Sequence, residues 1–553
     1  MRRLLALALF PAMLAAKDDW VKYASGPFEV MTDTGGRGGR DTLVRFEEFR
    51  QAIGDVLGQN DLGTPEPVRI MLFRNAKGFA AMPGVTMGRD RYAIVLEEKA
   101  AISPGLYADL TRLFLENNTS RMPLAFEHGL VEFFSTFQNK NVRIAVGAPP
   151  PNPDLDWARI HFLVTDPEYS GRLKVLLFNL RQGADLDPAC RNAFGKSAAE
   201  VEALVAKHLA AGNFQSTTLN SRTMADKDLV ERPVSDSDAG LARADLLAGD
   251  ASSAEYRELI HKGEKIAEAQ EGLGLLALAR HDDAQAHHAF AEAMAAGSAS
   301  ARCYIEYAKL EPDPDKASLA LRKAAALNPK LDEPFALLAA RDTDPAQRLA
   351  HWRAAAERNP RHPEYWKALA EASLAEHDYA EAAKAWSQGE HNATDPAQRA
   401  AMHQARLDVD QQRIDFEAAE KRRQAEEDAR DLARLKQEAI AHVHETEAKY
   451  NQGAKPSTEK PIPWWDGDAP SGKVRGTLRQ VDCLGKQLRL IVETADHKLV
   501  RLLVPNASQI AFLGGQQTLA CGKAGPRQVS IEYFPKSNSH LTTVGEVATI
   551  EFP

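Results

Sequence analysis

The sequence predicts a multidomain protein with an α+β domain, an all-α solenoid, a long charged helix and a small C-terminal β-barrel. Its 553 residues exceed what one hydrophobic core organises. An alanine-rich stretch repeats a pattern of large and small residues, and the final segment alternates short apolar runs with turn residues. The expected boundaries are 1–16 for a signal peptide, 17–219 for the α+β domain, 237–395 for helical repeats, 396–452 for a charged helical spacer, 453–471 for a proline-rich linker and 472–553 for the barrel.

The first residues have the layout of a signal peptide. Arg2 and Arg3 precede an apolar run at 4–14, and Ala15 and Ala16 follow it before the chain becomes polar. The run is too short to span a bilayer as a folded anchor, so no stable membrane span is expected. No cysteine follows the run, which argues against a lipid anchor. The sequence therefore predicts a periplasmic or secreted protein.

Charge and cysteine content narrow the function classes. A net charge of -9 with 26% charged residues gives no general electrostatic case for binding nucleic acid. Of the four cysteines, Cys483 and Cys521 share the C-terminal segment and are candidates for a disulfide in an oxidising compartment. The alternative is that both are small buried apolar residues. Cys190 and Cys303 fall in different predicted domains and are expected in their cores.

Apolar patterns predict the strands of the first domain, at 20–23, 28–30, 68–73 and 92–96. A run of glycines at 35–39 precedes a helix expected at about 42–57. The run has neither the Lys-Ser or Lys-Thr of a phosphate-binding loop nor dinucleotide spacing, so we interpret it as a flexible lead into the helix.

Residues 107–136 read as two helices laid out like the helix pair of a zinc peptidase. The first carries Ala-Asp-Leu-Thr-Arg at 108–112, and the second carries Gly-Leu-Val-Glu-Phe-Phe-Ser-Thr at 129–136. This stretch resembles the bacterial peptidase-MA-like, or gluzincin-like, domains, in which His-Glu-x-x-His is followed by Pro-x-Trp-Leu-x-Glu-Gly-Leu-Ala-Glu. The segment 187–197 resembles the end of the same domain. The resemblance thus covers roughly 17–219 and implies a gluzincin-like fold.

The positions that would hold zinc carry other residues. Laid on the family motif, the two histidines fall on Ala108 and Arg112, the water-activating glutamate on Asp109 and the third ligand on His128; Glu132 follows four residues later. Alanine has no lone pair to offer and arginine stays protonated in proteins. We therefore expect no metal, no cofactor and no catalytic residues, as in a pseudo-metallopeptidase. The alternative is an active hydrolase with an altered site around His128 and Glu132.

The alanine-rich stretch repeats a sequence pattern every 31 to 34 residues. Large apolar residues recur with spacings of 31, 31 and 34, at Phe290, Leu321, Trp352 and Trp386. Alanine stands four residues before three of them, and a small residue stands three residues after each. This pattern resembles tetratricopeptide repeats, which implies stacked helix pairs with a concave surface for a protein or peptide partner. We place binding on the exposed faces of the first helices, around Tyr304, Tyr307 and Lys309.

The remaining segments are a spacer, a linker and a barrel. The 396–452 stretch interleaves both signs of charge at spacings that suit i, i+4 pairs, which favours a solvated helix. Pro456, Pro461 and Pro463, three prolines within eight residues, then make 453–471 an extended linker. Barrel strands are expected at 474–481, 487–494, 499–504, 528–533 and 547–552.

Together these features predict an exported, non-catalytic scaffold that binds protein or peptide partners through its helical repeats. One alternative is the hydrolase described above. A second is an envelope glycan-binding protein that uses the C-terminal barrel, because small barrels of this kind often bind glycans. The sequence leaves the oligomeric state open.

Overall fold

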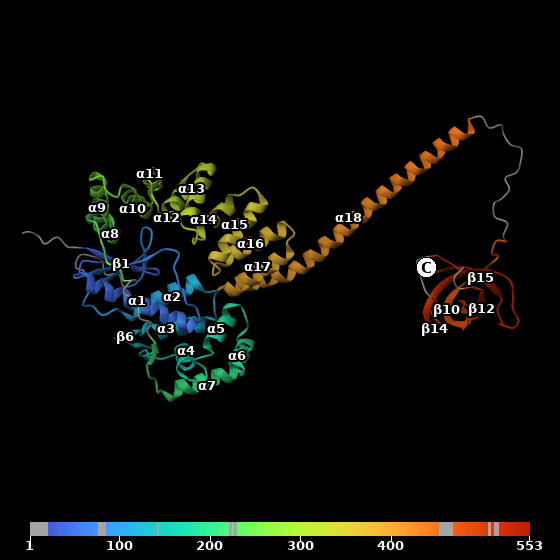
Figure 1. Ribbon diagram of the computed structural model, residues 1–553, viewed down its shortest axis with the longest axis horizontal. Coiled ribbons are helices and arrows are strands. Elements are labelled where there is room, and N and C mark those ends of the chain that lie inside the picture. The colour runs from blue at the N-terminus through green and yellow to red at the C-terminus, as the bar shows by residue number, and fades with distance from the viewer. Residues whose placement is uncertain are drawn as a thin grey trace, which may run out of the picture. The chain divides into compact units, whose positions relative to one another are not determined.

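The computed structural model describes residues 20–75, 84–140, 143–220, 224, 229–452, 468–506, 510–513 and 519–552. The chain divides into two compact units, Met1–Ala429 and Arg430–Pro553 (Figure 1). The predicted signal peptide at 1–16 and most of the predicted linker lie outside the described residues. None of the described helices is both long enough and apolar enough to cross a membrane.

A six-stranded sheet forms the centre of the α+β domain. Its order is β4–β5–β3–β2–β1–β9, with bounds Val21–Ser25 (β1), Phe28–Thr32 (β2), Val68–Phe73 (β3), Thr86–Met87 (β4), Tyr92–Glu97 (β5) and Arg232–Pro233 (β9). Strands β2, β3 and β5 are parallel, whereas β1, β9 and β4 pair antiparallel with their neighbours. The four strands expected from the apolar patterns are β1, β2, β3 and β5.

The two faces of this sheet are covered by different parts of the chain. One face, including Val30 and Ile70, shares a core with α1 (Gly36–Leu57), α2 (Pro104–Asn118) and α3 (Leu124–Ser135). The other face, including Met31 and Met71, packs on Ala239 and Leu246 of α8 (Asp236–Leu246). The rest of the domain comprises α4 (Leu155–Thr165), α5 (Leu173–Arg181), α6 (Leu186–Phe194), α7 (Ala198–Ala211) and the small sheet β6 (Gln138–Lys140), β7 (Arg143–Val146) and β8 (Thr217–Asn220).

Helix α1 begins inside the glycine run, several residues before its expected start. Gly39 explains why, because a Cβ there would stand 2.9 Å from the ring of Tyr23. The absence of a side chain lets the helix lie directly on β1. The glycines therefore serve close packing between helix and sheet, which the interpretation as a flexible lead missed.

Ten helices follow as a row of consecutive pairs beside the α+β domain (Figure 1). Their bounds are Asp236–Leu246 (α8), Gly249–His261 (α9), Ile266–Ala279 (α10), Asp283–Ala295 (α11), Ala301–Leu310 (α12), Pro314–Leu327 (α13), Glu333–Arg341 (α14), Pro345–Arg358 (α15), Pro363–Ala375 (α16) and Tyr379–Asn392 (α17). We call α8–α17 the helical array. It confirms the predicted all-α solenoid.

The recurring large residues sit between helices as the pattern predicts. Phe290 and Leu321 are fully buried, and Gly274 of α10 lies so close to Phe290 that a Cβ would stand 2.7 Å from its ring. Each large residue also follows a helix cap by eight positions. The caps are aspartates whose side chains accept backbone N–H bonds, at Asp282, Asp313, Asp344 and Asp378. They repeat with the spacing of the large residues and start the second helix of the last four pairs, whereas α9 begins after Ala248 without a side-chain cap.

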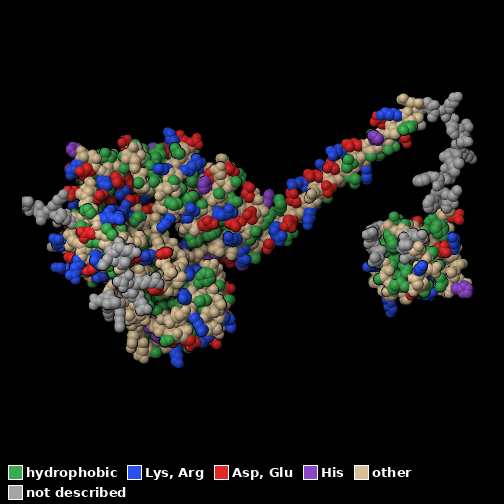
Figure 2. All heavy atoms as spheres, in the orientation of Figure 1, with side chains coloured by type: hydrophobic (Ala, Val, Ile, Leu, Met, Phe, Trp, Pro, Cys, Tyr) green, Lys and Arg blue, Asp and Glu red, His purple; other side chains and the backbone are tan. Residues whose placement is uncertain are grey.

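Helix α18 (Pro396–Asn451) continues from the array for 56 residues. Met402 and Val409 are buried against the last helix pair, and beyond them almost every side chain is exposed. Figure 2 shows positive and negative side chains intermixed along the helix. Arg413–Glu417 at 3.0 Å and Lys449–Glu445 at 2.7 Å are such pairs. They support a solvated helix.

The second unit contains a six-stranded sheet of order β12–β11–β10–β14–β15–β13, in which β12 also pairs with β15. The bounds are Gly472–Leu484 (β10), Gln487–Glu493 (β11), Leu499–Val504 (β12), Ala511–Leu513 (β13), Gly522–Phe534 (β14) and Gly545–Glu551 (β15). Cys483 and Cys521 are joined by a disulfide, whereas Cys190 and Cys303 are free and buried.

Candidate functional site

The α2 positions of the peptidase motif lie on an exposed helix surface. Arg112 bonds Asp109 on its own helix at 2.8 Å, and the two side chains are 56% and 40% exposed. Ala108 packs at the margin of the core. Asp109 and Arg112 therefore neutralise each other one turn apart, and within the described part of the chain neither makes a hydrogen bond or ion pair with α3.

The α3 positions face a different neighbour. His128 is 66% exposed, and its Nδ1 lies 3.7 Å from a carboxylate oxygen of Asp156 in α4. Glu132 is half-buried; its burial, together with Asp154 and Asp156, raises the pKa of its carboxyl. The structure thus brings His128 and Glu132 towards α4 rather than towards Asp109 and Arg112. Among the described residues, no group of three or more His, Cys, Asp or Glu side chains is arranged to hold a metal ion.

Glu127, which directly precedes His128, is the buried carboxylate of this helix pair. Arg361, from the loop before α16, donates to both of its oxygens at 3.1 and 2.8 Å. Arg361 also donates to the carbonyl and hydroxyl oxygens of Thr119 at the end of α2, each at 2.8 Å. The Glu127 carboxylate further accepts the backbone N–H of Met122 at 2.9 Å. Arg361 and Glu127 thus join the helical array to both α2 and α3.

Two asparagines of the array also make hydrogen bonds to the α+β domain, one about a helix pair before Arg361 in the chain and one about a helix pair after it. Asn328, at the end of α13, donates to the carbonyl oxygen of Pro65 at 2.9 Å and to the Glu66 carboxylate at 3.0 Å. Asn392, at the end of α17, accepts the backbone N–H of Arg121 at 3.0 Å. The chain before α14, before α16 and after α17 therefore contacts the α+β domain along a single edge of the array.

A buried ionic cluster fixes the other end of the array. Arg89, which is 5% exposed, lies 2.8 Å from Glu271 of α10, 3.4 Å from Asp245 of α8 and 3.3 Å from Asp90. Arg302 of α12 donates to the backbone carbonyl of Gly88 in the same turn. Because a buried charge without a partner is costly, this cluster holds the array and the sheet edge in one arrangement.

The residues predicted to bind a partner on α12 are engaged within the array. Tyr304 is only 8% exposed and donates to the carbonyl oxygen of Ser298, so the expectation that it lies on an exposed face is wrong. The ring of Tyr307 stacks on His287 at a centroid distance of 4.7 Å. Lys309 pairs with Glu306 at 3.1 Å and Glu333 at 2.6 Å. Helix α12 turns these side chains towards its neighbours, because the helices on both sides cover it.

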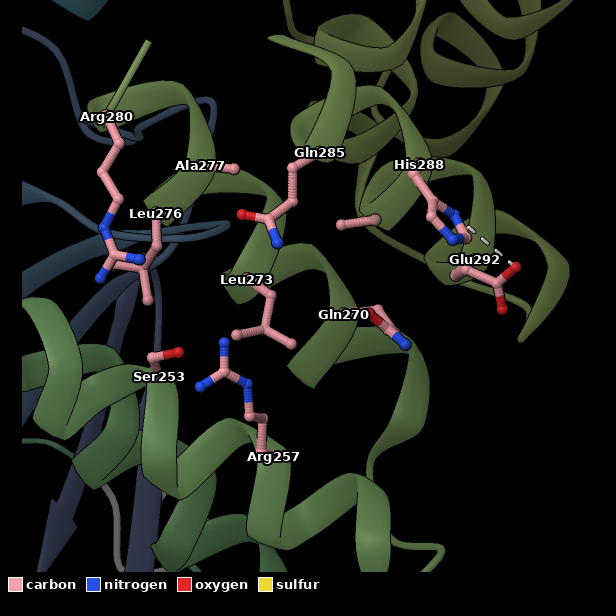
Figure 3. Close-up of a pocket in the computed structure, with 11 residues that line it drawn as sticks. Ser253, Arg257, Gln270, Leu273, Leu276, Ala277, Arg280, Gln285, His288 and Glu292 are labelled. Atoms are coloured by element: carbon pink, nitrogen blue, oxygen red, sulfur yellow. Dashed lines mark ion pairs between the residues drawn. The ribbon is translucent and has the colours of Figure 1, made fainter. Parts of the chain in front are cut away.

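A groove elsewhere on the array is lined by polar and apolar side chains. It has a volume of about 160 Å³ and lies between α9, α10 and α11 (Figure 3). Figure 3 shows Arg257 rising from α9 and Gln285 descending from α11 towards Leu273 of α10. Arg280 pairs with the fully exposed Asp250 at 2.9 Å, whereas no acidic side chain among the described residues pairs with Arg257. Two guanidinium groups thus line the groove around an apolar floor, together with one carboxylate, that of Glu292, which lies 3.9 Å from His288.

Sequence reasoning missed this groove because its cations come from separate helices with no shared motif. Its lining includes Ser253, Arg257, Gln270, Leu273, Leu276, Arg280 and Gln285. Only the repeat period placed α9, α10 and α11 next to one another. The orientation of Arg257 and Arg280 depends on the rotation of each helix about its axis.

No protein-family model matches the chain, and no curated protein matches it. Similar solved structures include MamA, at 14% identity and a TM-score of 0.24, covering 29% of this chain and 95% of that one. YrrB, described as a TPR protein with an unusual peptide-binding site, has 17% identity and a TM-score of 0.27, covering 31% and 92%. PilF of Pseudomonas aeruginosa has 16% identity and a TM-score of 0.26, covering 34% and 90%.

Proposed function

We propose that this protein is a scaffold whose helical array binds a protein or peptide partner in the groove between α9, α10 and α11. The observation that carries the proposal is that Arg257 and Gln285 extend towards the apolar floor formed by Leu273, while Arg280, paired with Asp250, lines the same groove. Guanidinium and amide groups so placed match a carboxylate, to which arginine donates two parallel hydrogen bonds. The volume of about 160 Å³ suits one side chain rather than a whole small-molecule ligand.

The docking of the array supports this function. The Arg361–Glu127 pair, the Arg89 cluster and the asparagine contacts hold α8–α17 at several points along its length. A binding surface held in one arrangement loses less conformational freedom when a partner binds. The partner therefore meets a preformed groove, and its affinity depends on the groove rather than on folding of the array.

The α+β domain serves in this proposal as a pseudo-peptidase platform. The resemblance of residues 107–136 to gluzincin-like domains supports its origin, and Ala108 and Arg112 support the loss of zinc binding. Glu127, beside the third-ligand position, now holds Arg361. The N-terminal segment 1–16 supports export, so we place the partner in the periplasm or outside the cell.

The function can be tested with short synthetic peptides of mixed composition that are immobilised on a solid support and incubated with the purified protein. We expect the retained peptides to be enriched in Asp or Glu next to apolar residues. Arg257→Gln and Arg280→Gln should lose this set. Arg322→Gln should keep it, because Arg322 is an exposed arginine of α13 outside the groove. Retention without acidic enrichment, or unchanged by the two groove variants, would rule out this groove as the binding site.

A further inference from the structure

A second and larger cavity lies where the α+β domain meets the end of the array. Its volume is about 640 Å³, within the range of sites that hold small organic molecules. The loop between α2 and α3 and the loop between α5 and α6 form one side. The end of α17 and the first turns of α18 form the other. Both parts of the first unit therefore contribute to one cavity.

Among the described residues, the cavity is lined by more positively charged side chains than negatively charged ones. Arg121, Arg399 and Arg406 line it, against the acids Glu390 and Asp185. Glu390 is already bound by Arg406 at 3.0 Å and by His403 at 2.8 Å. Asp185 is exposed. The cavity consequently carries an excess of cationic groups.

Two of the cations have no carboxylate partner among the described residues. Arg399 donates to the carbonyl oxygen of Ala393 at 3.2 and 2.7 Å. The Nε of Arg121 is shielded from solvent without a hydrogen-bond partner. Buried donors in folded proteins are normally paired, so the Arg121 guanidinium lacks an acceptor. A carboxylate or phosphate oxygen is an acceptor that arginine binds strongly.

Apolar side chains form another part of the lining. Leu124, the first residue of α3, is 53% exposed, although large apolar residues at helix starts gain by burial. Leu180 at the end of α5 and Leu186 at the start of α6 also line the cavity. A ligand that satisfies both parts of the lining has an anionic head and an apolar body.

The array positions the loop that carries Arg121. Asn392 accepts the backbone N–H of Arg121, and the Glu127 carboxylate, held by Arg361, accepts the next backbone N–H at Met122. The loop is therefore fixed in the docked arrangement before any ligand enters.

We propose that this cavity binds a small organic anion, with a carboxylate or phosphate head against Arg121 and Arg399 and an apolar body along Leu124. The site is separate from the groove of the array and does not rest on the proposed function. Because its lining comes from both the array and the α+β domain, a bound anion stabilises their docked arrangement.

Titration calorimetry of the full chain with octanoate and with octyl phosphate tests the site, with octanol as the uncharged probe. We expect saturable binding of at least one anion, and its identity distinguishes a carboxylate from a phosphate ligand. Arg121→Gln and Arg399→Gln should each weaken that binding by about tenfold or more, since each removes a charge-assisted hydrogen bond. Arg322→Gln, outside the cavity, should bind as the wild type does.

Circular dichroism of each variant checks that it is folded, and Leu124→Ser tests the apolar wall without altering a charge. We expect Leu124→Ser to weaken binding of the same anion. Three results would overturn the proposal. They are the absence of saturable binding by both anions, equal binding of octanol, and an affinity that the folded arginine variants leave unchanged.

Discussion

Arg361 donates one hydrogen bond to each carboxylate oxygen of Glu127, at 3.1 and 2.8 Å, from a residue 234 positions away in the chain. Both side chains are buried. The pair lies beside His128 and links α3 to the helical array. Glu127 therefore has a structural partner, which agrees with the proposed role of the α+β domain as a platform for the array.

The recurring large residues should dominate the stability of the array. Phe290 is fully buried between α10, α11 and α12, so Phe290→Ala leaves a cavity that costs about 3–5 kcal/mol. We expect urea denaturation, followed by helix content, to show a loss of that size. Leu319→Ala is the control, because Leu319 on α13 is 67% exposed and should change the stability by less than about 0.5 kcal/mol. Equal losses would show that the array is not packed around Phe290.

Burial raises the pKa of Glu66 from 4.5 to about 7 at the contact with Asn328. The folded chain therefore keeps this proton to a higher pH than the unfolded chain. The stabilisation is fully present below pH 4.5 and is lost as the pH rises to about 7. Allowing for solvent screening, we expect the wild type to lose about 1–2 kcal/mol more than Glu66→Gln over this range. Parallel curves of unfolding free energy against pH for the two proteins would show that Glu66 does not cause this loss of stability.

The Cys483–Cys521 disulfide closes a loop with a sequence separation of 38 in the second unit. On the chain-entropy account such a loop contributes about 3–4 kcal/mol. The Cys483→Ala/Cys521→Ala variant should therefore become sensitive to protease in the strands after Gly472 at a lower temperature. Helix content of the first unit should melt unchanged, because it has no disulfide among its described residues. An unchanged cleavage temperature would show that the bond adds little stability.

Local patterns in the sequence predicted much of the fold. The spacing of Phe290, Leu321 and Trp386 located the helix pairs, and the aspartate caps with the same spacing are a further signal that was overlooked. Alternation located the main strands. The start of α1 was missed because it depends on how closely Gly39 approaches Tyr23, a contact between separate elements.

The candidate sites were much less predictable. Tyr304 was expected on an exposed face, but the neighbouring helices bury it. Arg361 and Glu127 lie in different predicted domains, and neither carries a local sign of the other. The groove around Arg257 depends likewise on side chains from three helices. Sequence periodicity fixes which helices are neighbours, whereas the contacts between domains depend on tertiary packing.

The exposed motif positions should have little influence on folding. His128→Ala removes a side chain that is 66% exposed, and we expect it to change the unfolding free energy by less than about 0.5 kcal/mol. The variant should also bind the same immobilised peptides as the wild type, because His128 lies on α3 and the groove is lined by α9, α10 and α11. Elemental analysis should find no stoichiometric zinc. One zinc per chain, lost in His128→Ala, would restore the hydrolase alternative.

We expect Glu127 to act by holding Arg361, so that the α+β domain and the array form one body. A double-mutant cycle with Arg361→Gln and Glu127→Gln, read as unfolding free energy in urea, measures their coupling. Each single variant should lose about 3–5 kcal/mol, because it leaves a buried charge unpaired, and the double variant should lose much less than the sum. The pair Arg353–Glu381, at 3.3 Å with side chains 40% and 21% exposed, is the more solvated control and should couple by less than about 1 kcal/mol. A coupling between Arg361 and Glu127 as small as that of the control pair would show that this ion pair does not hold the array on the α+β domain.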